Sequence, residues 1–181
     1  MKKRIMVQMP LTDGICSVLD ARKDVEAVQF TQLSEDNILQ HVGEYDAAIL
    51  SITPFTARII DKADKMQIVA RHGVGYDAVD VPALTKKGIP LAVVGTANSV
   101  TVAEHALFFI LALAKRAILF DREVRKGNWD IRYDHIGYDI ADKKVLVLGL
   151  GRIGRRLVPM LNAMGMKVFV YDPYVLQDTI V

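Results

Sequence analysis

The chain contains very little cysteine and no large excess of either charge. Cys16 is the single cysteine among 181 residues, so no internal disulfide can form, and a reducing cytoplasm is the expected compartment. Cys16 itself is interpreted as a small buried hydrophobe rather than a nucleophile. The net charge of +2 gives no electrostatic reason to expect binding to nucleic acid or to an acidic membrane surface.

Long apolar runs and metal-binding patterns are also lacking. The longest apolar run covers residues 106–114, which is too short to span a bilayer, and Lys115 and Arg116 follow it. The basic N-terminus is not expected to act as a signal peptide, because Gln8 and Asp13 interrupt the apolar stretch that would be needed. The histidines show no metal-ligand spacing. We therefore expect a protein without a membrane span or a metal site.

Short apolar runs alternate with helical patterns over most of the chain, which is typical of βαβ units on a parallel sheet. Strands are expected at residues 4–9, 25–30, 47–51, 67–71, 89–94, 145–148 and 168–171. Helices are expected at residues 12–22, 34–42, from Thr53 and Pro54 onward, 80–88, 101–126 and 152–164, with a loop at 130–142. Ser34, Thr53 and Asp80 are expected to cap their helices.

The pattern divides into two structural units. Residues 1–98 form a complete small α/β unit, and a polar, hinge-like stretch at 95–99 ends it. Residues 99–181 begin a second α/β unit that is incomplete, so we expect the chain to be a truncated part of a longer protein. The strand that ends at Asp172 should have neighbours on both sides, and without the strands that follow it an apolar edge would lie open.

A glycine-rich turn carries the clearest chemical signal. The apolar run 145–148 is followed by Gly149, Gly151 and Gly154 in a G-x-G-x-x-G pattern, which is weak evidence by itself. Gly149 permits a tight turn, Gly151 lets the backbone approach a pyrophosphate, and Gly154 lets the next helix pack on the strand. The start of that helix offers free N–H groups and a positive dipole end to phosphates.

An acidic residue completes this pattern. Asp172 ends the next apolar strand, 18 positions after Gly154, close to the spacing of about 20 that is typical of NAD sites. Its carboxylate is suited to the ribose hydroxyls of NAD and would repel the 2′-phosphate of NADP. Two alternatives stay open: a flavin or another adenosine-containing ligand uses the same turn, or the glycines only shape a turn and Asp172 only caps a strand end.

Several blocks of sequence carry a specific resemblance to a known family. They are residues 71–80 (RHGVGYDAVD), 96–105 (TANSVTVAEH), 126–129 (KGNW), 148–154 (LGLGRIG), 163–166 (AMGM) and 171–173 (YDP). In this order they resemble the D-isomer-specific 2-hydroxyacid dehydrogenases, phosphoglycerate dehydrogenase-like members included. The resemblance covers almost all of the chain. It implies a flavodoxin-like substrate (catalytic) domain at 1–98, followed by the start of a Rossmann NAD-binding domain at 99–181.

The resemblance also implies roles for a loop in the first unit. Gly73, Val74 and Gly75 match the loop whose backbone N–H groups bind the substrate carboxylate. The residue types agree, because two glycines around Val74 permit a concave turn with converging donors. Arg71 matches a position that lines this pocket, and its guanidinium suits a carboxylate or a phosphate. A surface ion pair is an equally good interpretation of Arg71.

Further roles concern the cofactor. Arg152 and Ile153 match residues that wrap the pyrophosphate of NAD, and Asp172 matches the residue that binds the ribose. Val102 matches a position that packs against the nicotinamide ring, a role compatible with ordinary core packing. Together with Gly149, Gly151 and Gly154, these residues form the expected cofactor site.

The family's catalytic residues are expected outside this chain. In the family, a substrate-binding arginine, a glutamate and a proton-donating histidine all follow the position of Asp172. Glu104 and His105 precede the glycine turn and are therefore not taken as the catalytic pair. By resemblance, the protein is an NAD-dependent oxidoreductase that transfers a hydride between nicotinamide and a small 2-hydroxy or 2-keto acid. The resemblance leaves the particular acid open, and the 181 residues alone are expected to be inactive.

Two other functions remain open. One is an NAD(H)-binding regulatory or interaction module without turnover, similar to the family's transcriptional co-repressors. The other is a fragment that binds nothing. The apolar helix expected at 101–126 is the segment by which the family embraces a second subunit, so we also expect a homodimer.

Overall fold

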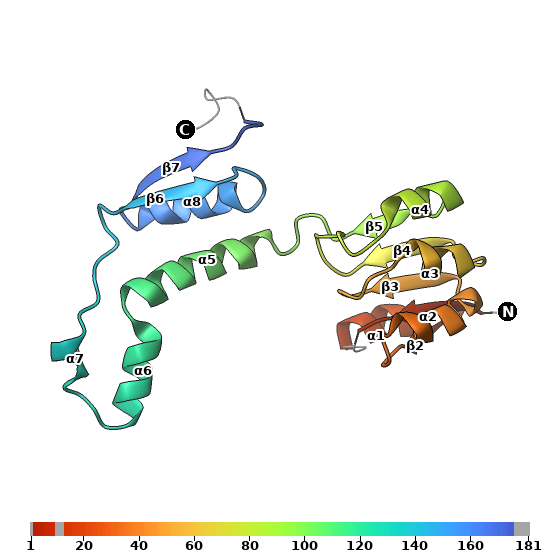
Figure 1. The fold of residues 1–181 in the computed structure, drawn as a ribbon, viewed down its shortest axis with the longest axis horizontal. Coiled ribbons are helices and arrows are strands. Elements are labelled where there is room, and N and C mark those ends of the chain that lie inside the picture. The colour runs from red at the N-terminus through yellow and green to blue at the C-terminus, as the bar shows by residue number, and fades with distance from the viewer. Residues whose placement is uncertain (1, 10–12, 176–181) are drawn as a thin grey trace. The chain divides into compact units, whose positions relative to one another are not determined.

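The computed structural model describes residues 2–9 and 13–175, and the chain divides into two units, residues 1–95 and 96–181 (Figure 1). Among the described residues, no helix combines the length and the apolar character that crossing a membrane requires. The side chain of Cys16 lies outside the described part.

The first unit is built on a five-stranded parallel sheet. Its strands are β1 (Lys3–Val7), β2 (Val25–Gln29), β3 (Ala47–Leu50), β4 (Ile68–Arg71) and β5 (Leu91–Val93), in the order β2-β1-β3-β4-β5. This is the flavodoxin-like order, and it confirms the expected fold of the first unit. The register places Met6, Ala48, Val69 and Leu91 in one row across four strands.

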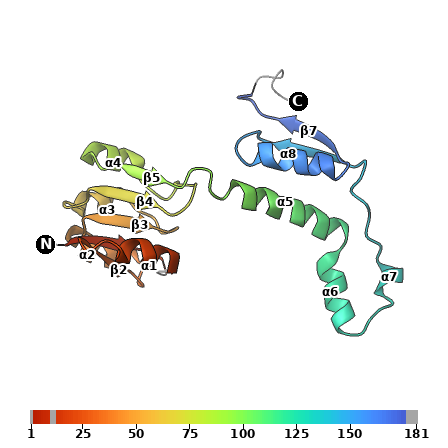
Figure 2. The same ribbon diagram turned by 180° about the vertical axis from the view of Figure 1, so that it is seen from behind.

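Helices cover both faces of this sheet. They are α1 (Asp13–Asp20), α2 (Glu35–His41) with a short 3-10 turn η1 (Val42–Glu44), α3 (Ala57–Lys62) and α4 (Val81–Lys87). Because parallel crossovers are right-handed, the reversal of strand order places α1 on one face and α2, α3 and α4 on the other (Figures 1 and 2). The main core lies beneath the latter three helices and includes Met6, Leu50, Phe55 and Ile60, all fully buried.

Of the three helix caps predicted in the first unit, the structure confirms two. The Ser34 hydroxyl accepts a hydrogen bond from the backbone N–H of Asn37, and the Asp80 carboxylate accepts one from Ala83, so both predicted caps are confirmed. The cap predicted at Thr53 is wrong.

The helix after Pro54 begins later because the preceding backbone is engaged elsewhere. Phe55 forms a parallel β-bridge with Val79, and its N–H donates to the Ala78 carbonyl at 2.7 Å. This extended segment delays the start of α3 to Ala57.

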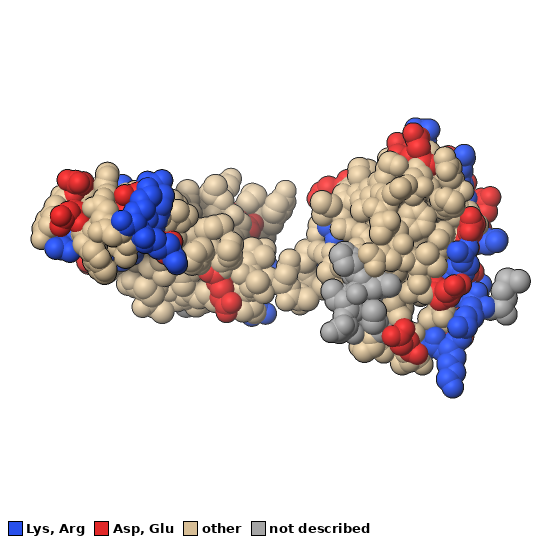
Figure 3. Space-filling view, turned by 90° about the horizontal axis from the view of Figure 1, so that it is seen from below, with Lys and Arg blue, Asp and Glu red and all other residues tan. Residues whose placement is uncertain are grey.

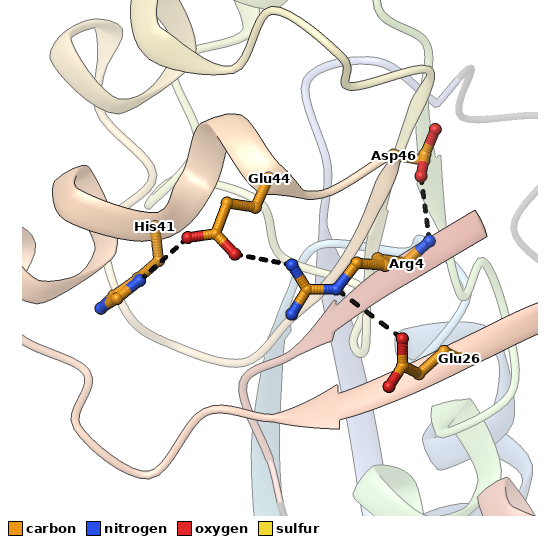
Figure 4. Close-up of polar contacts among 5 residues, drawn as sticks. All are labelled: Arg4, Glu26, His41, Glu44 and Asp46. Atoms are coloured by element: carbon orange, nitrogen blue, oxygen red, sulfur yellow. Dashed lines mark hydrogen bonds and ion pairs between the residues drawn. The ribbon is translucent and has the colours of Figure 1, made fainter. Parts of the chain in front are cut away.

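Ion pairs around Arg4 join three elements of the first unit (Figure 4). Its guanidinium lies 2.6 Å from Glu44 and 3.8 Å from Glu26, and its backbone N–H donates to the Asp46 carboxylate at 2.9 Å. Glu44 also contacts His41 at 3.3 Å. The hydrogen bond from the Arg4 guanidinium, and to a lesser degree the one with His41, holds the pKa of Glu44 below its ordinary value. These groups are largely solvated, so each pair contributes modestly to stability.

The second unit begins with helices and ends with a parallel strand pair. Its elements are α5 (Ser99–Ala114), α6 (Ala117–Arg125), α7 (Ile131–Asp134), β6 (Lys144–Leu148), α8 (Gly154–Ala163) and β7 (Lys167–Tyr171). β6 and β7 pair in parallel, and α8 packs against β7 and α5. This strand-helix-strand order, with both strands parallel, is the start of a doubly wound fold.

The helix predicted at 101–126 is wrong as a single element. It is divided into α5 and α6 by Arg116, whose φ of 51° lies in the left-handed region. The segment after α7 supports this break, because the Tyr138 N–H donates to the Ala114 carbonyl at 2.9 Å and the Arg116 side chain donates to Ile136. The loop predicted at 130–142 contains the short helix α7.

One face of the β6–β7 pair is open. Leu146, Leu148, Phe169 and Tyr171 alternate along the two strands, and all four side chains are exposed. Figure 3 shows broad uncharged areas on both units, with basic and acidic side chains interspersed rather than gathered by sign. The alternation indicates that α8 covers only one side of the strand pair.

Candidate functional site

The glycine turn after β6 is shaped by close backbone packing. Gly149 has a φ of 95°, and its N–H donates to the Tyr171 carbonyl at 2.8 Å, which ties the turn to β7. A Cβ on Gly154 would lie 2.2 Å from the Gly149 carbonyl oxygen. Only glycine fits at position 154, and its absence of a side chain lets the start of α8 approach the strand.

Free donors gather at the start of α8. Among the described residues, the backbone N–H groups of Gly151, Ile153 and Gly154 have no acceptor. A Cβ added to Gly151 would meet no atom within 4 Å, so open space lies beside the turn. Unpaired donors at a helix N-terminus, together with the positive end of its dipole, are suited to a phosphate or pyrophosphate.

Asp172 is held against this turn. One of its carboxylate oxygens accepts from the Leu150 N–H at 2.6 Å and the other from the Tyr174 N–H at 2.9 Å. The pKa of Asp172 lies below its ordinary value, chiefly because of the hydrogen bond from Leu150. The hydrogen bond from Tyr174 and the charge of Arg155 lower the pKa further. The group is therefore an ionised carboxylate whose remaining lone pairs can accept hydrogen bonds from ribose hydroxyls. The backbone-capping role and a ribose-binding role are compatible.

The other expected cofactor residues lie on two elements. Arg152 and Ile153 belong to the turn, and Ile153 precedes α8 as its cap. Val102 lies in the first turn of α5, partly exposed. The structure therefore brings Arg152, Ile153 and Asp172 together around the glycines, while Val102 stands on a separate helix.

The loop after β4 has the geometry of a small anion site. The Gly73 N–H donates to the Arg71 carbonyl at 2.8 Å, and the Gly73 carbonyl accepts from Val94 at 3.2 Å. Among the described residues, the N–H groups of Val74 and Gly75 have no acceptor. Two adjacent free donors in a glycine-containing turn suit a carboxylate.

Arg71 lies against this loop. Its guanidinium donates to the His72 carbonyl, and a Cβ on Gly73 would lie 2.5 Å from its Nη1 atom. The Nε atom is buried and has no partner among the described residues, and no carboxylate of the described part pairs with this side chain. This placement favours the anion-site interpretation over a surface ion pair.

His105 packs among aromatic side chains of its own helix rather than against Glu104. His105 packs edge-to-face on Phe109, with 4.2 Å between ring centroids, and no ion pair joins it to Glu104. No group of three or more His, Cys, Asp or Glu side chains in the described part is arranged to hold a metal ion.

Gln8 is a buried polar residue that the sequence did not single out. It follows β1 directly, its side chain is 1% exposed, and neither amide atom has a partner among the described residues. The available signal was a polar residue at the end of an otherwise apolar strand, where the interior would favour an aliphatic side chain.

Comparisons with known proteins agree on one family. The protein-family model described as "D-isomer specific 2-hydroxyacid dehydrogenase, catalytic domain" matches residues 5–171. A D-3-phosphoglycerate dehydrogenase of Synechocystis sp. is 38% identical over 96% of the chain, and one of Methanocaldococcus jannaschii is 34% identical over 95%. The chain spans 32% of each of these relatives, about a third of their length.

Solved structures of dehydrogenases and reductases also match the fold of the chain. The pyruvate reductase of Chlamydomonas reinhardtii matches 97% of the chain with a TM-score of 0.78 and 27% identity, and the chain covers 53% of it. The NAD-dependent formate dehydrogenase of Staphylococcus aureus, in complex with NAD, matches 95% of the chain with a TM-score of 0.81 and 24% identity, and the chain covers 56% of it. The second match supports the fold alone.

Proposed function

The chain belongs to the D-isomer-specific 2-hydroxyacid dehydrogenase family, and we propose that it supplies the substrate-binding and cofactor-phosphate-binding parts of an NAD-dependent oxidoreductase. The reaction is hydride transfer between nicotinamide and a small 2-hydroxy or 2-keto acid. Residues 1–98 form the substrate-binding domain, and residues 99–181 form the first part of the NAD-binding domain. The observation that carries this proposal is the set of free N–H groups at the glycine turn beside the ionised Asp172.

The residues of the turn fit the phosphates and ribose of NAD. The amides of Gly151, Ile153 and Gly154 would hold the pyrophosphate, and Asp172 would accept the ribose hydroxyls. The negative charge of Asp172 disfavours the 2′-phosphate of NADP. When bound, the nicotinamide supplies or accepts the hydride.

The loop after β4 fits the acid. The N–H groups of Val74 and Gly75 would hold its carboxylate, and Arg71 would add a positive charge from beside Gly73. Fixing the carboxylate orients the neighbouring carbon for reaction. Backbone donors do not discriminate among small acids, so the loop sets the class of substrate rather than its identity.

Proton transfer belongs to residues that the family places after the position of Asp172. The 181 residues by themselves would bind NADH and a 2-keto acid without turning them over. The alternative is a regulatory module, which would bind NADH but no 2-keto acid.

Two titrations and an assay distinguish these functions. The isotope-labelled chain is titrated with NADH and, separately, with pyruvate and glyoxylate, while the backbone amide NMR signals of residues 73–75 and 149–154 are followed. The oxidoreductase proposal predicts that each ligand perturbs its own loop and that NADH absorbance stays constant with both present. Binding of NADH without any acid would favour the regulatory module, and NADH oxidation would refute the absence of catalytic residues.

We also propose a cytoplasmic homodimer. The single cysteine suits a reducing compartment. An apolar hollow of about 310 Å³ between α5 and α6 supports self-association, and its lining includes Phe108, Phe109, Leu113 and Ile118. Leu113 is 75% exposed, and a contiguous apolar surface of this kind commonly marks an interface.

A further inference from the structure

The unpartnered buried polar atoms of the described residues belong to only two side chains. They are the amide nitrogen and oxygen of Gln8 and the Nε atom of Arg71. Buried polar groups are normally satisfied, and the exceptions commonly mark functional positions. Both residues lie in the first unit.

The sheet register places the two side chains on one face at one level. The Gln8 N–H donates to the Ile49 carbonyl, which continues the β1–β3 ladder and sets Gln8 opposite Leu50. Leu50 in turn pairs with Arg71 on β4. Because partners in a parallel ladder project to the same side, Gln8 and Arg71 flank the fully buried Leu50, with about 10 Å between their strands.

This row lies where the topology of the sheet favours a ligand. The order β2-β1-β3-β4-β5 reverses direction between β1 and β3, so the switch point of the sheet lies beside Gln8. In open α/β sheets, ligands bind outside the carboxyl ends of strands at such a point. Gln8 follows the carboxyl end of β1, and the free amides of Val74 and Gly75 follow that of β4.

From these observations we infer that Gln8 is a specificity-determining residue, which hydrogen-bonds an oxygen substituent on C3 of the acid held by the loop after β4. This inference rests on the proposed function. A carboxamide donates and accepts, so it complements a hydroxyl group, which does the same. An acid without an oxygen on C3, such as pyruvate, leaves the amide unsatisfied, so the site favours a 3-hydroxy-2-keto acid over an alkyl 2-keto acid.

Gln8 is expected to affect the stability of the chain as well as its binding of acids. An unsatisfied buried amide destabilises the fold, whereas an apolar side chain of similar length does not. Gln8→Met is therefore expected to raise the unfolding temperature of the chain and to abolish its preference between acids. Gln67→Met is the matched control, because Gln67 is exposed and precedes β4 at the opposite end of the same sheet.

Calorimetric titration of the full chain with hydroxypyruvate and with pyruvate tests the inference. The native chain is expected to bind hydroxypyruvate at least about tenfold more tightly, Gln8→Met to bind both acids equally, and Gln67→Met to behave as the native chain. Equal affinities in the native chain, an unchanged preference in Gln8→Met, or a lowered unfolding temperature of Gln8→Met would overturn the inference alone. Failure of the native chain to bind either acid would overturn the substrate half of the proposed function, and this inference with it.

Discussion

Gly151 and Gly154 have opposite surroundings within one turn. A Cβ on Gly154 would lie 2.2 Å from the backbone oxygen of Gly149, whereas one on Gly151 would meet open space. Gly154→Ala is therefore expected to lower the free energy of unfolding of the second unit by about 2 kcal/mol, since a packed backbone must shift.

Urea unfolding followed by the fluorescence of Trp129 measures this change, because this single tryptophan belongs to the second unit. Gly151→Ala is the control and is expected to alter the unfolding free energy by less than about 0.5 kcal/mol. A Gly154→Ala variant as stable as the native chain would contradict the packing of the turn.

Asp172 makes the second unit sensitive to acid. Its folded-state pKa is lowered, chiefly by the Leu150 hydrogen bond, so its stabilising contribution is present above the unfolded pKa of about 3.9 and is lost as pH falls through the folded value. In an NMR titration, its carboxyl carbon is expected to change shift below pH 3.9. Asp172→Asn is expected to lose part of the acid-dependent decrease in stability. Titration of Asp172 at or above the ordinary aspartate value would refute this account.

At the residue scale, the sequence predicts the tight turn of the glycines and the position of Asp172 beside it, but it gives no sign of the burial of Gln8. The spacing of Gly149, Gly151 and Gly154 between apolar runs has a direct steric reason, which a reader of the sequence can reconstruct. The position of Gln8 depends on which strands are neighbours in the sheet. The sequence of one strand does not contain the order of the strands in the sheet. A glutamine at the end of an apolar run is therefore interpreted as the start of a loop.

Pro159 interrupts the interior of α8. It is exposed, has no N–H to donate to the carbonyl four residues earlier, and crowds the preceding turn of the helix. Pro159→Ala is expected to raise the free energy of unfolding of the second unit by about 1–3 kcal/mol. Arg156→Ala, at another exposed position of α8, is expected to change it by less than about 0.5 kcal/mol.

Chemical denaturation of these two variants beside the native chain gives the comparison. A Pro159→Ala variant no more stable than Arg156→Ala would mean that α8 accommodates the proline without loss.

At the element scale, strands are predicted better than helix boundaries. The strands read as short runs rich in aliphatic residues between turn signals, so all seven were located within a few residues. The break at Arg116 was missed because it depends on contacts of Ala114 and Arg116 with residues 20 and more positions away. The late start of α3 has the same cause, a bridge between Phe55 and Val79.

The proposed self-association concerns the whole molecule. Leu113→Glu places a charge in the apolar hollow of α5 and α6, where the side chain is exposed and the fold is not expected to change. The dimer is expected to dissociate at least about tenfold more readily in this variant.

Light scattering at micromolar concentration measures the change. Val18→Glu is the control, since Val18 is an exposed aliphatic residue of the first unit. A native chain that is monomeric at this concentration, or a dimer that Leu113→Glu leaves intact, would refute the proposed interface.

Calorimetric titration with NADH tests the central claim most directly, which is that the turn from Gly149 to Gly154 binds the phosphates of NAD. The native chain is expected to bind one NADH per chain, and to bind it more tightly than NADPH because of the charge of Asp172. Gly151→Ala is expected to bind NADH at least about tenfold more weakly with an unchanged circular dichroism spectrum, because its Cβ occupies the open space beside the turn. A folded native chain that does not bind NADH, or undiminished binding by Gly151→Ala, would contradict the account.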